Sequence, residues 1–179
     1  MHRLTATDTP MVRYTRTIFP SYASVVLARI DNRLLHGVVA TQWSPETGCN
    51  RLMVIDDDVA NDPQKKEMMK FGRPSGVNLS IINEETALKN FENHKYDGQK
   101  VFIVTKSPST LLKVFKFESI PTVNVGGTVK IENGIELSSR AMASEKDLED
   151  YKKLKELGAT VQIQYVPSDK ITPIEKFLG

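Results

Sequence analysis

A histidine, two arginines and an aspartate lie close together near the start of the chain, where residues 28–37 read ARIDNRLLHG. The imidazole of His36 can act as a nucleophile and as a proton carrier near neutral pH. Guanidinium groups match phosphate oxygens, and two of them beside a histidine favour its neutral, nucleophilic form. The residue types therefore predict a histidine that accepts a phosphoryl group, with Arg29 and Arg33 forming a cationic cradle around it.

Asp31 and Gly37 complete this stretch. Asp31 either tethers Arg33 or orients the imidazole, and the spacing leaves both roles open. Gly37 permits close approach of the backbone, and a helix that begins just after it would direct N–H groups at an anion.

Elements of an α/β domain must position these residues. Apolar runs predict strands at residues 24–30, 51–56, 76–82, 100–105, 121–125 and 160–166, and helical patterns lie between them, at residues 37–43, 62–72, 83–91, 107–117 and 144–157, with a short terminal helix over 169–178. The first helix is expected to break near Pro45. Asn133-Gly134 predicts a hairpin turn, hence a local antiparallel piece. The pattern favours a single α/β domain with a mostly parallel central sheet, helices on both faces and an antiparallel edge strand.

Helix signals along the chain support these boundaries. Asp62, Asn83 and Ser107 are candidate N-caps, and Pro follows two of them at the first helical position. Ser144 and Asp147 have the spacing of a capping box, with Asp in place of the usual Glu or Gln.

Ligands of open α/β sheets bind beyond the carboxyl ends of the strands. The residues expected there, besides the histidine stretch, are Asp56 to Asp58, Thr105, Lys106, Asn124, Gly126 and Gly127. The three aspartates either hold Mg²⁺ or, as we favour, cap the next helix and pair with nearby arginines. No glycine-rich nucleotide fingerprint is present.

Composition limits the classes of protein. The 179 residues suit one domain, and a net charge of +2 argues against a nucleic-acid-binding protein. The single cysteine, Cys49, is expected in the core, and a chain without disulfides fits a cytoplasmic location. No run approaches a membrane span. We expect His94 to be solvated, Trp43 to lie in the core or an interface, and no zinc site. Residues 1–23 are expected to be an unrelated or disordered extension, unless Ile18, Phe19 and Tyr22 pack on the domain.

Several segments together resemble a known family. They read VLARIDNRLLHGVVATQW, LMVIDDDVANDPQKKEMM, PSGVNLSI, VNVGG and LKELGATVQIQYVP. They are similar to the IIB component of the mannose/fructose/sorbose/N-acetylgalactosamine family of the bacterial phosphoenolpyruvate-dependent sugar phosphotransferase system. The resemblance runs from about Ser24 to the C-terminus, and the R-I-D-x-R-L-x-H-G segment is its most specific part.

The resemblance implies a phosphocarrier enzyme, a phosphohistidine–sugar phosphotransferase. His36 would take a phosphoryl group on Nδ1 from a phosphorylated IIA domain and pass it to a sugar imported through the membrane components IIC and IID. Arg33 and Arg29 would contact the phosphoryl oxygens, and Asp31 matches the loop aspartate. No cofactor, metal or nucleic acid is implied, a homo-oligomer is allowed, and the sugar is not identified. An exposed loop would suit a histidine that faces two partners.

The chain departs from the family pattern at two places. Val38 stands where many members have Gln, so either a side-chain amide near the phosphate is missing or this position acts through its backbone only. Thr128 and Val129 stand where many have Met-His, which leaves the backbone N–H groups of Gly126 and Gly127 as the candidates in that loop. Two other functions remain as alternatives: a non-catalytic anion-binding or regulatory module, and a phosphatase, which the absence of a clear general acid weakens.

Overall fold

The computed structural model describes residues 24–179, and the expectation for residues 1–23 lies outside them. The strands are β1 (Ser24–Asp31), β2 (Arg51–Ile55), β3 (Asn78–Ile82), β4 (Lys100–Thr105), β5 (Thr122–Gly127), β6 (Ile135–Ser138), β7 (Ala141–Ala143), β8 (Thr160–Ile163) and β9 (Thr172–Pro173). The helices are η1 (Val39–Trp43), α1 (Ser44–Thr47), α2 (Asp57–Ala60), α3 (Pro63–Lys70), α4 (Glu84–Glu92), α5 (Pro108–Val114), α6 (Glu145–Glu156) and η2 (Ile174–Phe177).

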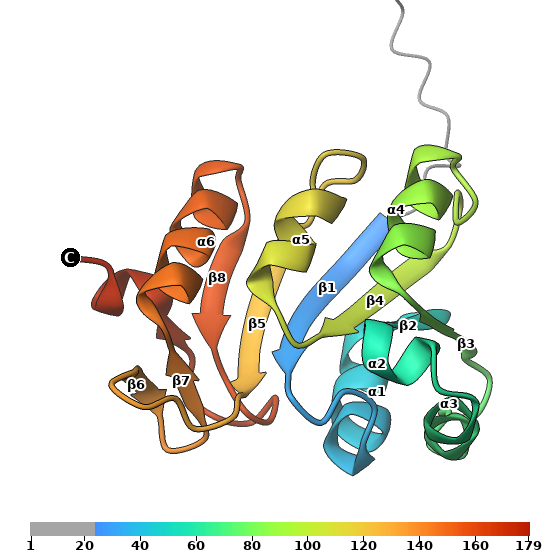
Figure 1. The fold of residues 1–179 in the computed structure, drawn as a ribbon, viewed down its shortest axis with the longest axis horizontal. Helices are drawn as coiled ribbons and strands as arrows, with labels where there is room; N and C mark the ends of the chain where they lie inside the picture. The colour runs from blue at the N-terminus through green and yellow to red at the C-terminus, as the bar shows by residue number, and fades with distance from the viewer. Residues whose placement is uncertain (1–23) are drawn as a thin grey trace, which may run out of the picture.

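Seven strands form one sheet in the order β3-β2-β4-β1-β5-β8-β9, shown in Figure 1. All pairs are parallel except β8 with β9, so the predicted antiparallel edge strand is confirmed in β9. β1 lies between β4 and β5. The loops that follow these central strands therefore lie together at the carboxyl end of the sheet.

The sheet has a core on each face, as a parallel sheet buried on both sides requires. Successive residues of β2 show this alternation: Met53 and Ile55 join one cluster of buried side chains, whereas Leu52 and Val54 join the other. Helices α4, α5 and α6 cover the first face (Figure 1). Val39 and Trp43 of η1 belong to the second cluster, so the predicted two-sided arrangement is confirmed.

The predicted caps are confirmed. Asp62, Asn83 and Ser107 each accept a hydrogen bond from a backbone N–H of the first turn that follows. Ser144 and Asp147 form the reciprocal capping box at the start of α6, which shows that the shorter Asp side chain reaches the N-cap backbone here.

Two local predictions were wrong. The antiparallel pair is formed by β6 and β7, joined through residues 139–140, and not by strands on either side of Asn133-Gly134. Asn133 does adopt the left-handed conformation that its turn requires, with φ of 57°, but the residues before that turn pair with no strand. Pro45 does not break the first helix, because it lies at the first turn of α1, where its missing N–H costs nothing, and the helix ends at Gly48 with φ of 63°.

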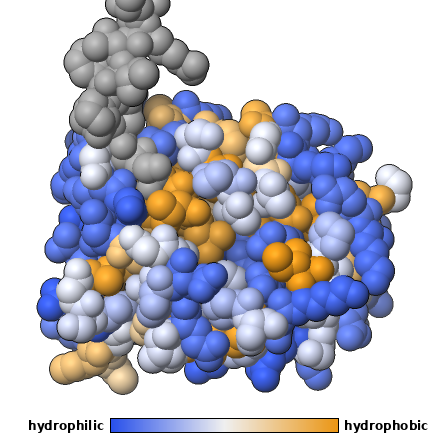
Figure 2. Space-filling view, turned by 180° about the vertical axis from the view of Figure 1, so that it is seen from behind, coloured by the Kyte–Doolittle hydropathy of each residue, from blue (hydrophilic) through white to orange (hydrophobic). Residues whose placement is uncertain are grey.

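The surface is mixed. Figure 2, which views the molecule from behind, shows apolar side chains gathered in patches among hydrophilic ones. None of the helices within residues 24–179 is long and apolar enough to cross a membrane. Cys49 is buried, as expected, and Trp43 belongs to the core.

Stability is expected to fall as the pH rises because of Glu118, which follows α5. Burial, and then the nearby charge of Asp97, raises the pKa of Glu118 to about 7. The unfolded chain releases this proton near pH 4.5, whereas the folded chain keeps it until about pH 7, so the free energy of unfolding falls between these two pH values. Glu118→Gln should leave stability unchanged at pH 5 and raise it by roughly 1 kcal/mol at pH 8, measured by urea unfolding.

Glu156→Gln is the matched control, since Glu156 is an exposed residue of α6. It should shift stability equally little at both pH values. An equal effect of the two substitutions at pH 8 would contradict this account of Glu118.

Candidate phosphoryl-transfer site

The residues that follow β1 form a tightly held loop. Asn32 donates its backbone N–H to the carbonyl of Gly127 at 3.0 Å, and Arg33 donates its backbone N–H to Oδ1 of Asp31 at 3.0 Å. Leu34 and Leu35 are buried in the core on one face of the sheet. Leu34 has a φ of 57°, a left-handed conformation that costs a leucine about 1 kcal/mol or more and that its burial must offset. The loop is therefore fixed by backbone bonds and by anchoring side chains.

His36 stands at the end of this loop, against Asp31. Its Nε2 lies 2.9 Å from Oδ2 of Asp31. Burial raises the pKa of Asp31, but the hydrogen bond from His36, the charge of Arg29 and the N–H of Arg33 together hold that pKa below its usual value. An ionised carboxylate can only accept, so Nε2 carries the proton and Nδ1 carries the lone pair of the neutral ring. Asp31 thus performs both roles that the spacing left open, since it orients the imidazole and holds the backbone at Arg33.

The side chain of His36 is 8% exposed, so it is not free on an exposed loop as expected. The bond to Asp31 and the burial of Leu34 and Leu35 draw the ring against the protein. The Asp31 bond engages Nε2 and leaves Nδ1 as the other ring nitrogen.

Helix η1–α1 begins directly after the histidine. Ala40 donates its N–H to the carbonyl of His36 at 2.9 Å, so His36 is the residue at which the helix starts. By helix geometry, the N–H groups of Gly37, Val38 and Val39 have no carbonyl within the helix to bond. Their positive ends favour an anion at this point. This agrees with the expectation for a helix start next to Gly37. The backbone N–H of Val38 is one of these unbonded donors, so this residue can bind an anion without a side-chain amide.

Arg29 does not lie where the sequence suggested. Its side chain is fully buried and lies in β1, and its guanidinium donates to Oδ2 of Asp31, Oδ1 of Asn124 and the carbonyls of Gln164 and Tyr165. These acceptors hold the guanidinium within the core, so Arg29 is not part of an exposed cationic cradle. It instead fixes Asp31, and through Asp31 the orientation of His36.

Gly126 serves the same buried arginine. A Cβ atom at this position would lie 2.0 Å from Cζ of Arg29, so the glycine makes room for the guanidinium. Gly127 contributes its carbonyl to the loop through Asn32 and lines the cleft beside it. A Cβ at Gly37 would meet nothing within 4 Å, so that residue faces open space.

A cleft of about 510 Å³ opens beside the loop. Arg33, whose side chain is exposed, lines it together with Asp31, and Lys130 and Arg140 add two cations that sequence reasoning missed. Arg140 lies in the turn between β6 and β7 and stacks on the ring of Tyr165, 4.0 Å from its centroid. The misplaced hairpin explains the omission, because a correct turn at residues 139–140 would have directed attention to Arg140.

The three aspartates after β2 act as caps and ion-pair partners. Asp56 accepts from the N–H of Val59 and pairs with Lys106, and Asp57 accepts from the N–H of Glu84. Asp58 pairs with Lys65. The capping interpretation is therefore confirmed, although the partners are lysines and not arginines. Within residues 24–179 no cluster of three or more potential metal ligands is found.

Comparison with known proteins adds to this geometry. The family model described as the PTS system sorbose subfamily IIB component matches residues 25–179, which is most of the chain. The chain belongs to this IIB family.

Named relatives and solved structures agree. The chain is 33% identical over 149 residues to the N-acetylgalactosamine-specific phosphotransferase enzyme IIB component 1 of Escherichia coli K12, covering 82% of this chain and 94% of the relative. It is 32% identical over 149 residues to the mannose-specific EIIAB component of the same strain, covering 83% of this chain but 46% of that relative, so the chain spans about half of the EIIAB length. The crystal structure of the IIBSor domain of the sorbose permease from Klebsiella pneumoniae superposes with a TM-score of 0.79 at 28% identity, covering 87% and 96% of the two chains.

The buried arginine in this IIB domain can be tested through the glycine beside it. Gly126→Ala should lower the free energy of unfolding by about 3 kcal/mol or more, because the added methyl group displaces a buried, paired guanidinium. Urea unfolding followed by circular dichroism measures the change.

Gly37→Ala is the control, since it adds the same methyl group into open space. It should leave stability unchanged or raise it by up to about 1 kcal/mol. Equal stability of the Gly126→Ala protein and the unsubstituted protein would show that Arg29 is not held as described.

Proposed function

We propose that this IIB domain carries a phosphoryl group on His36, from a phosphorylated IIA protein to a sugar. Its family works in the phosphotransferase system and in sugar import. The observation that carries the assignment to His36 is its hydrogen bond to Asp31, which leaves Nδ1 as the nucleophile at the start of a helix.

The first transfer balances without a cofactor. The lone pair of Nδ1 attacks the phosphorus of a phosphohistidine on IIA, a new N–P bond forms, and the N–P bond of the donor breaks. The donor histidine leaves with its electron pair, and Asp31 stabilises the positive charge that develops on the ring of His36. A loose transition state of this kind needs alignment and charge stabilisation more than covalent assistance.

The second transfer runs toward the sugar. A sugar hydroxyl attacks the phosphorus, the O–P bond forms, and the Nδ1–P bond of His36 breaks while the hydroxyl proton is released to an acceptor. The sugar would be held by the membrane components IIC and IID, and it would be of the mannose, fructose, sorbose or amino-sugar type that the relatives' names give. Docking to each partner would be brief, with a modest interface and electrostatic steering.

The groups that would stabilise the phosphoryl oxygens come from the loop after β1 and from the helix that follows it. Arg33 supplies an exposed guanidinium, and the first N–H groups of helix η1–α1 supply backbone donors. Arg29 takes part only as a positioning residue, because its donors are used within the core. Gly127 remains a candidate from the neighbouring strand, since it lines the same cleft.

His36 can be tested by labelling. A phosphorylated IIA partner should transfer its phosphoryl group to the protein, and His36→Ala should abolish the label. The label should be labile in acid and stable in alkali, as the N–P bond of a phosphoramidate is. His94→Ala is the control, because it removes an exposed histidine that lies after α4 and outside the loop of His36, and this variant should label normally. Label retained by the His36→Ala protein would overturn the assignment, and no label on the unsubstituted protein would favour an anion-binding module.

One experiment distinguishes a role of Arg33 in phosphoryl transfer from a structural role. Arg33→Ala should slow phosphoryl transfer about a hundredfold, since one donor to the developing charge is lost. Because the side chain is exposed, the free energy of unfolding should change by less than about 0.5 kcal/mol. Rapid-quench labelling gives the rate, and Arg33→Lys should restore part of it. A large loss of stability at an unchanged rate would instead make Arg33 a structural residue.

A further inference from the structure

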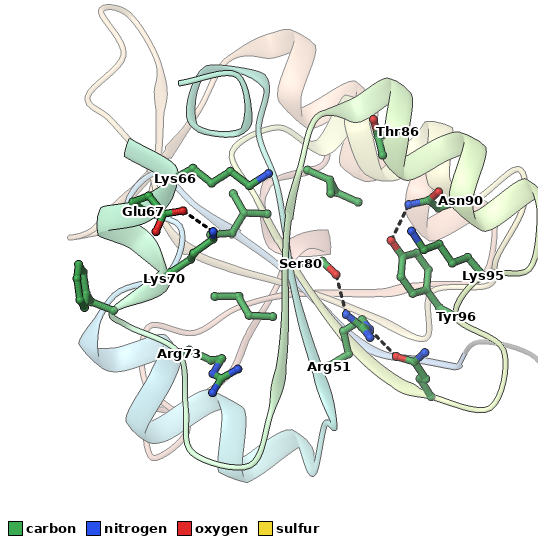
Figure 3. Close-up of a pocket in the computed structure, with 15 residues that line it drawn as sticks. Arg51, Lys66, Glu67, Lys70, Arg73, Ser80, Thr86, Asn90, Lys95 and Tyr96 are labelled. Atoms are coloured by element: carbon green, nitrogen blue, oxygen red, sulfur yellow. Dashed lines mark hydrogen bonds and ion pairs between the residues drawn. The ribbon is translucent and has the colours of Figure 1, made fainter. Parts of the chain in front are cut away.

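A second open feature lies at the β3 edge of the sheet, and His36 is not among the residues that line it. A groove of about 670 Å³ runs along β3, the strand at that edge, between α3 on one side and α4 with the turn after it on the other (Figure 3). Four consecutive residues of β3 line the groove: Leu79, Ser80, Ile81 and Ile82. Because alternate side chains of a strand point to opposite faces, a groove that touches all four must follow the edge of the strand itself.

Within residues 24–179, no strand pairs with the outer side of β3. Asn78 donates its N–H to the carbonyl of Asn50, and Ile82 accepts from the N–H of Asp56, so these two residues face β2. In a parallel pair, residues alternate between the two sides, hence Leu79 and Ile81 direct their N–H and C=O groups outward. The pairing of β3 with β2 has no bulge, and the strand contains neither proline nor a charged residue. The usual protections of an edge strand are thus absent from β3 itself.

The walls of the groove are cationic. Five basic side chains line it, against one acidic side chain, Glu67, and they are Arg51, Lys66, Lys70, Arg73 and Lys95. Glu67 is paired with Lys70, and Arg51 is held by Ser80 and Gln99 (Figure 3). Among the ion pairs found within residues 24–179, none involves Lys66, Arg73 or Lys95. Positive charge therefore stands on both sides of an open strand edge.

We propose that this groove binds an extended, acidic segment of another protein, which adds to the sheet as a strand beside β3. The outward backbone groups of Leu79 and Ile81 would supply main-chain hydrogen bonds, as in other cases of strand addition. Carboxylates of the added strand would face Lys66 and Arg73 on one wall and Lys95 on the other. We choose an acidic segment because five basic side chains and only one acidic side chain line the groove.

The same charges disfavour the two occupants that the chain itself could provide. A second copy paired edge to edge would bring an identical set of cations against the first. Residues 1–23 contain three arginines and one aspartate, so they carry net positive charge as well. The acidic segment must come from a different protein. Its binding does not depend on His36 or on the proposed phosphoryl transfer.

A defined peptide tests the proposal. The probe is the fluorescein-labelled heptapeptide Glu-Glu-Val-Glu-Val-Glu-Glu, which places glutamates on both faces of an added strand. It is titrated in 150 mM salt and followed by fluorescence anisotropy. Two changes should each weaken binding at least tenfold: methylation of the five central amide nitrogens of the peptide, and the double substitution Lys66→Glu with Arg73→Glu in the protein. Amide resonances of Leu79 and Ile81 should shift on binding.

The matched control is Lys152→Glu with Lys153→Glu, which makes the same change of net charge on the exposed face of α6. It should leave binding within twofold, and both double variants should unfold at the same urea concentration as the unsubstituted protein. Equal binding of the methylated peptide would show mere charge attraction and overturn strand addition. No binding of the unmethylated peptide would show that the cations only guard the edge, and would also overturn the proposal.

Discussion

The buried guanidinium of Arg29 is the interaction on which the site depends. A charge removed from water costs several kcal/mol unless it is paired and its donors are bonded. Here β1 brings Asp31 to the same face two residues later, β5 supplies Asn124, and the segment after β8 supplies the carbonyls of Gln164 and Tyr165. Asn124 keeps a buried Nδ2 without a hydrogen-bond partner within the described residues, a cost that its bond to the arginine must offset. One charge thus joins three segments of the sheet.

The pairing of Arg29 with Asp31 also affects which nitrogen of His36 carries the proton. Burial by itself would raise the pKa of Asp31, yet its partners hold that pKa below the usual value. A carboxyl group with a depressed pKa stabilises the fold above its unfolded pKa and loses that contribution as the pH falls through the folded value. At neutral pH Asp31 is therefore an obligatory acceptor, and the proton of His36 is confined to Nε2. The ring nitrogen that keeps the lone pair is therefore set by a bond to a carboxylate that also pairs with the buried Arg29.

The sequence predicted the layers and the caps, because each rests on a local pattern: apolar runs, and Asp62 or Ser107 before a helix. The role of His36 stays a prediction. The sequence misjudged Arg29, although a signal was present, since Arg29 and Asp31 are two apart in a strand and must share a face. It could not show Arg140 beside the site, because that depends on which turn closes the β6–β7 hairpin. The groove along β3 depends on strand order, which no local pattern contains.

In the proposed function His36 meets two different partners in turn, and the division of the cations suits that requirement. Arg29 is sealed in the core, so the orientation that it imposes on Asp31 and His36 does not depend on which partner is docked. Arg33 and Arg140 are exposed, so they can adjust to each partner and to the phosphoryl group as it moves. If Arg29 were exposed like Arg33, a partner's charge could compete for Asp31, and the imidazole of His36 would lose its fixed tautomer. Had both arginines been buried, the phosphoryl group would lack an adaptable donor. One arginine inside and one outside satisfies both requirements with a separation of four residues.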